Sequence, residues 1–165
     1  YFWNTQTKNW DYGTLTKTAR ATNWAAAVRT KKILPGEMFL YKPNEDQAIM
    51  ITGEVPDEGQ LEVNINAAGD YSALGYPYPA EIAWTNTPIA LNANGGDTVY
   101  FWNTQTKNWD YGTLTKTARA TNWASSVRAK VVAPGEGFFF KAASGDATTA
   151  SFERPYDWPA AADGE

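Results

Sequence analysis

The sequence contains a long internal repeat, which constrains the possible folds more than any other feature. Residues 1–25 recur letter for letter as residues 100–124, so the repeat period is 99 residues. Similarity continues from residues 26–42 to residues 125–141 and then fades. Short solenoid repeats run to roughly 20–50 residues, whereas a unit of this length has the size of an independent β-sandwich domain.

The repeat also predicts the domain organisation. We expect an incomplete first copy over residues 1–53 and a complete β-domain over residues 54–165, which contains the second copy. Selection for a shared surface and a recent duplication both explain the identical blocks. Surface positions such as Thr5, Gln6 and Lys8 would drift under packing constraints alone, so recent duplication is the simpler explanation. The identity is therefore not evidence of a binding site.

Each copy carries a pattern that predicts a β-hairpin. Residues 97–103 are rich in β-branched and aromatic residues, residues 104–107 form a polar turn, and residues 108–112 are again partly aromatic. Alternation along the first strand gives it two apolar faces, which is typical of a central strand that is covered on both sides. Val99 and Phe101 lie on one predicted face, and Tyr100 and Trp102 on the other.

Further strands and turns follow in both directions along the chain. Pro134-Gly135 predicts a type II turn before an apolar strand. Short strands are also predicted at residues 60–66, 71–76 and 147–152, one helical turn at residues 79–84, and irregular structure at residues 19–28 and 118–127. Many short strands without a long amphipathic helix favour an all-β fold, an antiparallel β-sandwich-like domain.

The composition excludes several kinds of chemistry. The chain has no cysteine and no histidine, which excludes disulfides, thiolate nucleophiles, histidine acid–base relays and most zinc or copper sites. A net charge of −4, with scattered Lys and Arg, gives no basic surface for nucleic acid. No run approaches the roughly 18 apolar residues of a membrane helix, so no membrane insertion is expected.

The sequence begins inside a predicted strand. Tyr1 is the counterpart of Tyr100, which follows Gly-Gly-Asp-Thr-Val. A shortened strand leaves unpaired backbone groups that a strand of another chain can complete, so we expect self-association through a β-edge or an apolar patch. A cut in a longer protein explains the same start.

Paired carboxylates are the remaining candidates for catalysis. Glycoside hydrolysis needs two carboxyl groups that face a sugar across roughly 5–10 Å. The candidates recur once per repeat, as structural residues do, so we expect that the protein is not an enzyme. They are Asp11 and Asp110, Glu37 and Glu136, and Glu54 and Glu153.

A loop rich in Asn and Asp is the candidate metal site. Asn92, Asn94 and Asp97 offer the oxygen ligands that calcium prefers. The loop matches neither an EF-hand nor a nonapeptide calcium repeat, and a Gly/Asn turn explains the same residues. No other cofactor is expected.

The aromatic residues give the strongest binding hypothesis. Aromatics make up 15% of the chain, with eight Trp and nine Tyr. Exposed rings of this kind serve as flat platforms in sugar-binding modules, whereas buried ones serve as core and cross-strand pairs. The candidate glycan-binding residues are Trp10, Tyr12 and Trp24 in the first copy and Trp109, Tyr111 and Trp123 in the second.

With these motifs placed, the chain resembles modular β-domains of large exported bacterial proteins. In such modules a G-N-P-Y-P-like segment precedes a kelch-like strand pair and a P-G-E-G-F-F segment, which correspond here to residues 75–79, 99–110 and 134–140. Tyr76 stands where the pattern often carries Asn. The resemblance implies an extracellular or cell-surface location and a structural or adhesive role, without catalytic residues. Carbohydrate binding by the repeated aromatic residues is the alternative.

Overall fold

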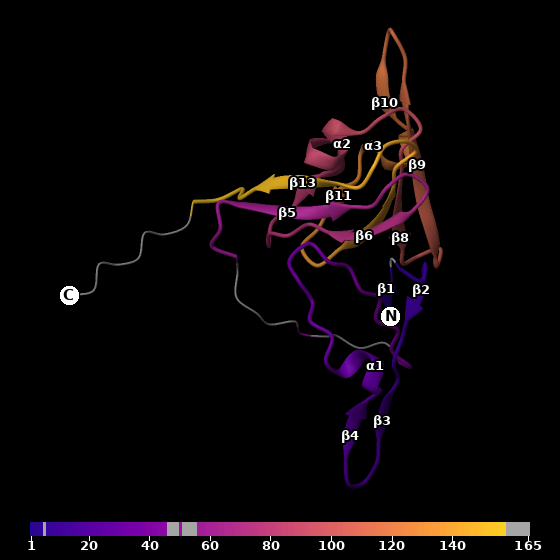
Figure 1. Cartoon of the computed structure of the whole chain (residues 1–165), viewed down its shortest axis with the longest axis vertical. Coiled ribbons are helices and arrows are strands. Elements are labelled where there is room, and N and C mark those ends of the chain that lie inside the picture. The colour runs from indigo at the N-terminus through magenta and orange to yellow at the C-terminus, as the bar shows by residue number, and fades with distance from the viewer. Residues whose placement is uncertain (5, 46–49, 51–55, 158–165) are drawn as a thin grey trace, which may run out of the picture.

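The computed structural model describes residues 1–4, 6–45, 50 and 56–157, which form an all-β structure with antiparallel sheets and short helices (Figure 1). None of the helices in these residues is long and apolar enough to cross a membrane. The helices are α1 (Ala26–Arg29), the 3₁₀ helix η1 (Trp84–Asn86), α2 (Pro88–Asn92) and α3 (Ser125–Arg128). The strands are β1 (Phe2–Asn4), β2 (Asn9–Asp11), β3 (Leu15–Lys17), β4 (Thr22–Trp24), β5 (Gln60–Ile65), β6 (Tyr71–Gly75), β7 (Ile82–Ala83), β8 (Thr98–Asn103), β9 (Asn108–Lys116), β10 (Thr121–Trp123), β11 (Val131–Val132), β12 (Gly137–Lys141) and β13 (Thr148–Glu153).

The largest sheet has five antiparallel strands in the order β10-β9-β8-β12-β6. The predicted hairpin is confirmed as β8–β9, and β8 lies in the middle of the sheet as predicted. Its inward residues Val99 and Phe101 are buried, while Trp102 on the outer face is exposed. The strands predicted at residues 60–66, 71–76 and 147–152 are also confirmed, as β5, β6 and β13.

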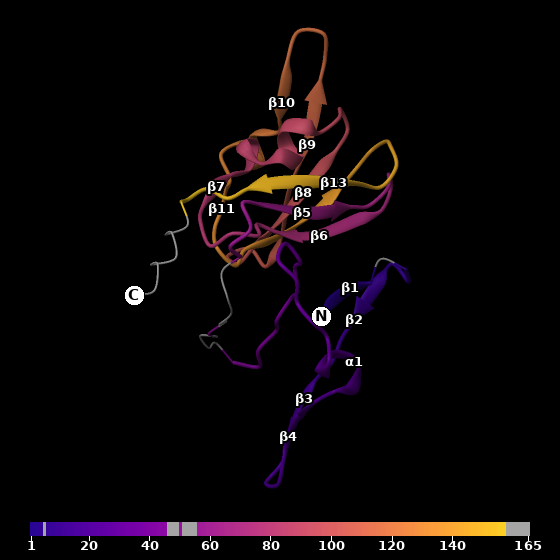
Figure 2. The same ribbon diagram turned by 60° about the vertical axis from the view of Figure 1, so that its left-hand side comes forward.

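A second layer covers the inner face of this sheet, which gives a sandwich-like arrangement (Figure 2). The β5–β13 pair contributes Val63, Ile65, Ala150 and Phe152, because alternate residues of both strands point inward. The segment with η1 and α2 covers the other end of the same face. One continuous core results, in which all these elements meet.

Trp84 lies at the centre of this core. Its side chain is fully buried, and its ring makes edge contacts with Phe101, Trp123 and Phe138 at centroid distances of 5.7, 5.1 and 5.4 Å. Edge-to-face contacts of this kind contribute about 0.5–1.5 kcal/mol each beyond burial. The Trp84 indole N–H has no hydrogen-bond partner among the described residues, so the indole contributes to the core through packing.

The turns carry the residue types that their backbone conformations require. Gly135 has a φ of 77°, and the amide of Glu136 donates to the carbonyl of Ala133 at 3.0 Å, which confirms the predicted type II turn. The first copy repeats this turn around Gly36, which has a φ of 81°. In the β8–β9 hairpin, the Asn103 side-chain oxygen accepts the amides of residues 105 and 106.

Two local predictions were wrong. The helical turn predicted at residues 79–84 is absent. The 3₁₀ helix η1 begins at Trp84 instead, and α2 begins at Pro88, where the Thr87 hydroxyl caps it by accepting the amide of Ala90 at 3.1 Å. Residues 118–127 were predicted to be irregular but contain β10, which pairs with the end of β9, and most of α3. The same correction applies to residues 19–28, which contain β4 and part of α1.

The first copy repeats the hairpin elements of the second without the layer that covers them. The β1–β2, β3–β4 and α1 elements correspond to β8, β9, β10 and α3. The β3–β4 hairpin and the β9–β10 hairpin project from opposite ends of the molecule (Figures 1 and 2). The described first-copy residues thus form an open half-domain next to a covered one.

Candidate interaction surface

An aromatic cluster joins the two copies. Trp3 and Trp10 of the β1–β2 hairpin pack edge-on against Phe139 of β12, with ring centroids 5.9 and 5.6 Å apart. Trp3 also contacts Tyr71 of β6 at 6.1 Å, and Trp109 of β9 contacts Phe139 at 5.2 Å. Phe139 is therefore surrounded by rings from both copies and is buried although it lies on the outer face of the sheet. We call these five residues the inter-copy cluster.

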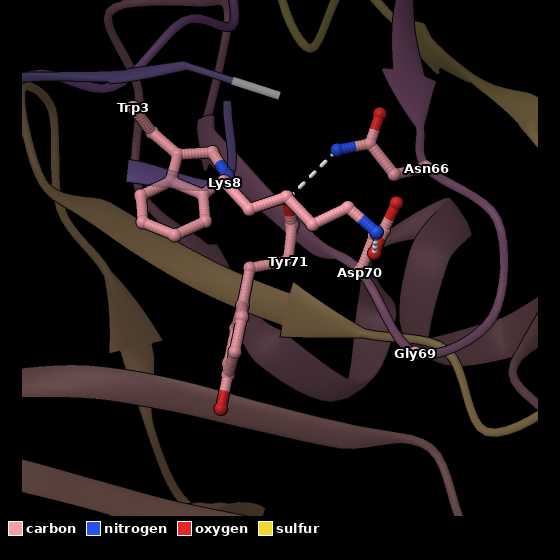
Figure 3. A pocket seen from close by; sticks show the side chains of 6 residues that line it. All are labelled: Trp3, Lys8, Asn66, Gly69, Asp70 and Tyr71. Carbon is pink, nitrogen blue, oxygen red and sulfur yellow. Dashed lines mark hydrogen bonds and ion pairs between the residues drawn. The ribbon is translucent and has the colours of Figure 1, made fainter. Parts of the chain in front are cut away.

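A small cavity of about 180 Å³, lined by Trp3, Lys8, Asn66, Gly69, Asp70 and Tyr71, lies beside this cluster (Figure 3). The Lys8 ammonium crosses it to form an ion pair with Asp70 at 2.6 Å, and Asn66 donates to the carbonyl of Tyr71 at 2.7 Å. Lys8 has a φ of 51°, an uncommon conformation for a residue other than glycine. Because the Lys8 side chain is largely exposed, the ion pair contributes at most about 1 kcal/mol and chiefly sets orientation.

Backbone contacts extend the junction between the copies. The amide of Gly75 donates to the carbonyl of Gly36 at 2.9 Å, and Glu37 forms a bridge with Leu74. Met38 is buried against Gly137, where the absence of a Cβ makes room for its thioether. Gly137 is the second-copy counterpart of Met38, so this sequence difference between the copies lies at their contact.

The rest of the outer sheet face carries a row of partly exposed rings. Tyr111 stacks on Tyr100 at 5.7 Å, Tyr100 contacts Tyr71 at 5.6 Å, and Trp102 contacts Trp109 at 5.3 Å. Tyr111 is 62% exposed and Trp102 is 39% exposed. These two rings offer the largest free aromatic area on this face.

The Tyr100 phenol is expected to ionise late. Burial, together with a hydrogen bond to Tyr71 and the negative charges of ionised Tyr71 and Tyr111, raises the pKa of Tyr100 to about 12. In the unfolded chain this pKa is about 10, so stability that is present below pH 10 is lost as the pH rises from about 10 towards 12. Burial also raises the pKa of Tyr76 and Tyr78, so ultraviolet titration of phenolate absorbance should show a late component whose amplitude Tyr100→Phe lowers by one phenolate. A folded protein whose tyrosines all ionise near pH 10 would contradict this.

The predicted glycan-binding residues do not share one environment. Trp123 is buried in the core, whereas its counterpart Trp24 is 41% exposed. Trp10 and Trp109 are half-buried in the inter-copy cluster. The remaining two candidates, Tyr12 and Tyr111, are exposed and stack on Tyr1 and Tyr100, respectively.

Of the predicted calcium residues, Asn92 ends α2, and Asn94 and Asp97 lie in the turn between α2 and β8. Both carboxylate oxygens of buried Asp97 accept backbone amides, from Asn94 at 2.7 Å and from Ala143 at 2.8 Å. Asn92 donates its side-chain amide to the carbonyl of Pro88. Asp97 therefore closes the turn and ties it to the end of β12. Among the described residues no three acidic side chains gather in a group that could hold a metal ion.

The repeated carboxylates close turns in the same manner. Glu37 and Glu136 accept the amides of Leu34 and Ala133 across their Pro-Gly turns, at 3.0 and 3.1 Å. Asp11 and Asp110 each accept the side-chain amide of an Asn across the hairpin, at 2.9 Å. Glu54 lies outside the described residues, and its counterpart Glu153 ends β13.

Sequence reasoning did not single out several residues of this surface. Phe139 and Tyr71 come from strands that were predicted only as apolar runs, and Trp84 was placed in a helical turn. The available signal was the Phe138-Phe139-Phe140 run, since three consecutive aromatic residues on a strand must present a ring to each face. Comparison of the chain with protein-family models, curated proteins and solved structures gave no match.

Proposed function

We propose that this chain is a non-enzymatic structural repeat module of an exported bacterial surface protein, in which consecutive copies pack against one another through aromatic side chains. The observation that carries the proposal is the inter-copy cluster, in which Trp3 and Trp10 of one copy enclose Phe139 of the next. Ring contacts of this kind contribute about 0.5–1.5 kcal/mol each beyond burial, so together they favour packing of the two copies. Such packing suits a spacer or an adhesive stalk.

The second copy carries the same docking elements on its surface, which supports an arrangement that continues in one direction. Trp102 and Lys107 are the counterparts of Trp3 and Lys8, and both are exposed. Lys107 has a φ of 54°, close to the 51° of Lys8, so the two turns share their conformation. A head-to-tail contact of this type joins different surfaces of successive units and extends into a fibre if it does not close.

A matched pair of variants tests the packing in the full chain. Trp3→Ala removes three ring contacts, with Trp10, Tyr71 and Phe139, and should release the first copy from the second. Trp102→Ala removes an exposed ring from the same sequence context and is the control. Small-angle scattering should give a larger radius of gyration for Trp3→Ala only. Identical scattering profiles for Trp3→Ala and the unaltered chain would contradict the proposal.

Carbohydrate binding is the second candidate function, and the exposed rings of Tyr111 and Trp102 on one sheet face favour it. Flat rings at this exposure offer stacking surfaces for the apolar faces of sugars. Screening the chain against immobilised glycans, with Tyr111→Ala as the variant, tests this function. Retention of the unaltered chain by a glycan that no longer retains Tyr111→Ala would favour carbohydrate binding. If no glycan retains the chain, only the structural function is supported.

A further inference from the structure

The first copy presents a core face that is covered in the second copy. Trp24 is 41% exposed and Leu15 is 40% exposed, whereas their counterparts Trp123 and Leu114 are 5% and 2% exposed. The same difference holds for Phe2, Val28 and Phe39, which are half-buried, while their counterparts are among the core residues. Sequence-identical side chains therefore have different surroundings, and the difference comes from outside the repeated block. We call these five first-copy residues the open face.

In the second copy, residues 82–93 cover this face. Trp84 inserts its ring among Phe101, Trp123 and Phe138, and Ile89 and Ala90 of α2 join the same core. The segment carries no charged residue, and its buried side chains are apolar except for Thr87, which caps α2. The capped helix α2 buries Ile89 and Ala90, and η1 buries Trp84.

The open face keeps the shape that accepts this segment in the second copy. Leu15 pairs with Trp24 across β3–β4, as Leu114 pairs with Trp123 across β9–β10. The Phe2 and Phe39 rings lie 5.8 Å apart, and those of their counterparts lie 5.6 Å apart. The face is thus formed before any cover is added, which lowers the cost of ordering on binding.

We infer that the open face binds a segment with the sequence of residues 82–93, with the tryptophan of that segment as the anchor. The inference rests on the proposed repeat-module function, because such a segment is part of the repeat unit. Its basis is that the identical face in this molecule already binds this segment.

The test uses the full chain and a fluorescently labelled synthetic peptide of residues 79–97, with binding followed by fluorescence anisotropy. We expect saturable binding that changes little with salt, because no charged pair carries it. A Trp84→Ala peptide and a Trp24→Ala chain should each bind about tenfold more weakly or worse, as for a buried aromatic anchor. Tyr12→Ala, which alters an exposed ring outside the open face, is the matched control and should bind normally.

Three outcomes would overturn the inference. The first is that the peptide does not bind the unaltered chain. The second is that it binds equally well to the Trp24→Ala chain. The third is that the chain forms a dimer that Trp24→Ala abolishes and the peptide does not disturb. The last outcome would assign the open face to a second copy of the same face. Because Trp3 is not part of the open face, scattering by Trp3→Ala still tests the repeat-module function when peptide binding fails.

Discussion

Trp123→Ala is expected to lower the free energy of unfolding of the second copy by about 3–5 kcal/mol, the usual cost of removing a large aromatic side chain from a core. Trp123 is 5% exposed and contacts Trp84 at a centroid distance of 5.1 Å. The cavity left by its indole would lie between β10, which pairs with β9, and η1, whose Trp84 amide donates to the carbonyl of Lys130 at 2.8 Å. Urea denaturation followed by circular dichroism measures the loss.

Trp24→Ala is the matched control because the two tryptophans lie in identical 25-residue blocks. Trp24 is 41% exposed, so its removal is expected to cost about 1 kcal/mol or less. The comparison cancels the effects of helix and strand propensity, which are equal at the two sites. Equal losses for the two variants would mean that the first copy is covered as fully as the second.

Gly112→Ala is expected to cost about 1–3 kcal/mol through overpacking. A Cβ at this position would clash with a methyl group of Val127 and lie 3.2 Å from the Cβ of Ala124. Val127 is fully buried, so it has no free space into which to move. Thermal unfolding should therefore show a lower melting temperature, and Gly112→Ala combined with Val127→Ala should lose less than the sum of the two single variants.

Gly13→Ala is the corresponding change in the first copy. Its Cβ would meet Val28 in the same manner, but Val28 is only half-buried and can change rotamer. The expected cost is below that of Gly112→Ala. A larger cost for Gly13→Ala would show that the open face is packed more tightly than its exposure indicates.

Much of the fold could be predicted because strands and turns leave local signals. Alternation along residues 97–103 predicted β8, and Pro134-Gly135 predicted its turn, since both patterns reflect the conformation of a few consecutive residues. The helix at Pro88 was missed although Thr87-Pro88 is a helix-start signal. The helical turn was predicted at Pro79 instead, which is also a proline but has no Thr before it to cap a helix. The β10 strand was missed because its pairing with β9 outweighs the low strand propensity of its flanking residues.

The candidate site could not be predicted in the same way. Trp24 and Trp123 have the same neighbours in sequence, so no local pattern distinguishes an exposed ring from a core ring. The difference arises from Trp84, which is distant from both in sequence and covers only one of them. Likewise, Phe139 became part of an interface because the first copy packs on the outer face of the sheet, a tertiary contact without a sequence signature.

Amide hydrogen exchange followed by nuclear magnetic resonance tests the central claim, that one copy is covered and the other open, most directly. The amides of Ala25 and Ala124 make the same hydrogen bond, each at 3.2 Å, to Thr14 and Thr113. Both alanines follow a tryptophan, so their intrinsic exchange rates are nearly equal. The exposed tip amides of Thr18 and Thr117, each bonded at 2.8 Å, serve as the internal control and should exchange alike. The account predicts that Ala124 is protected at least about 100-fold more strongly than Ala25. Equal protection of Ala25 and Ala124 would contradict it.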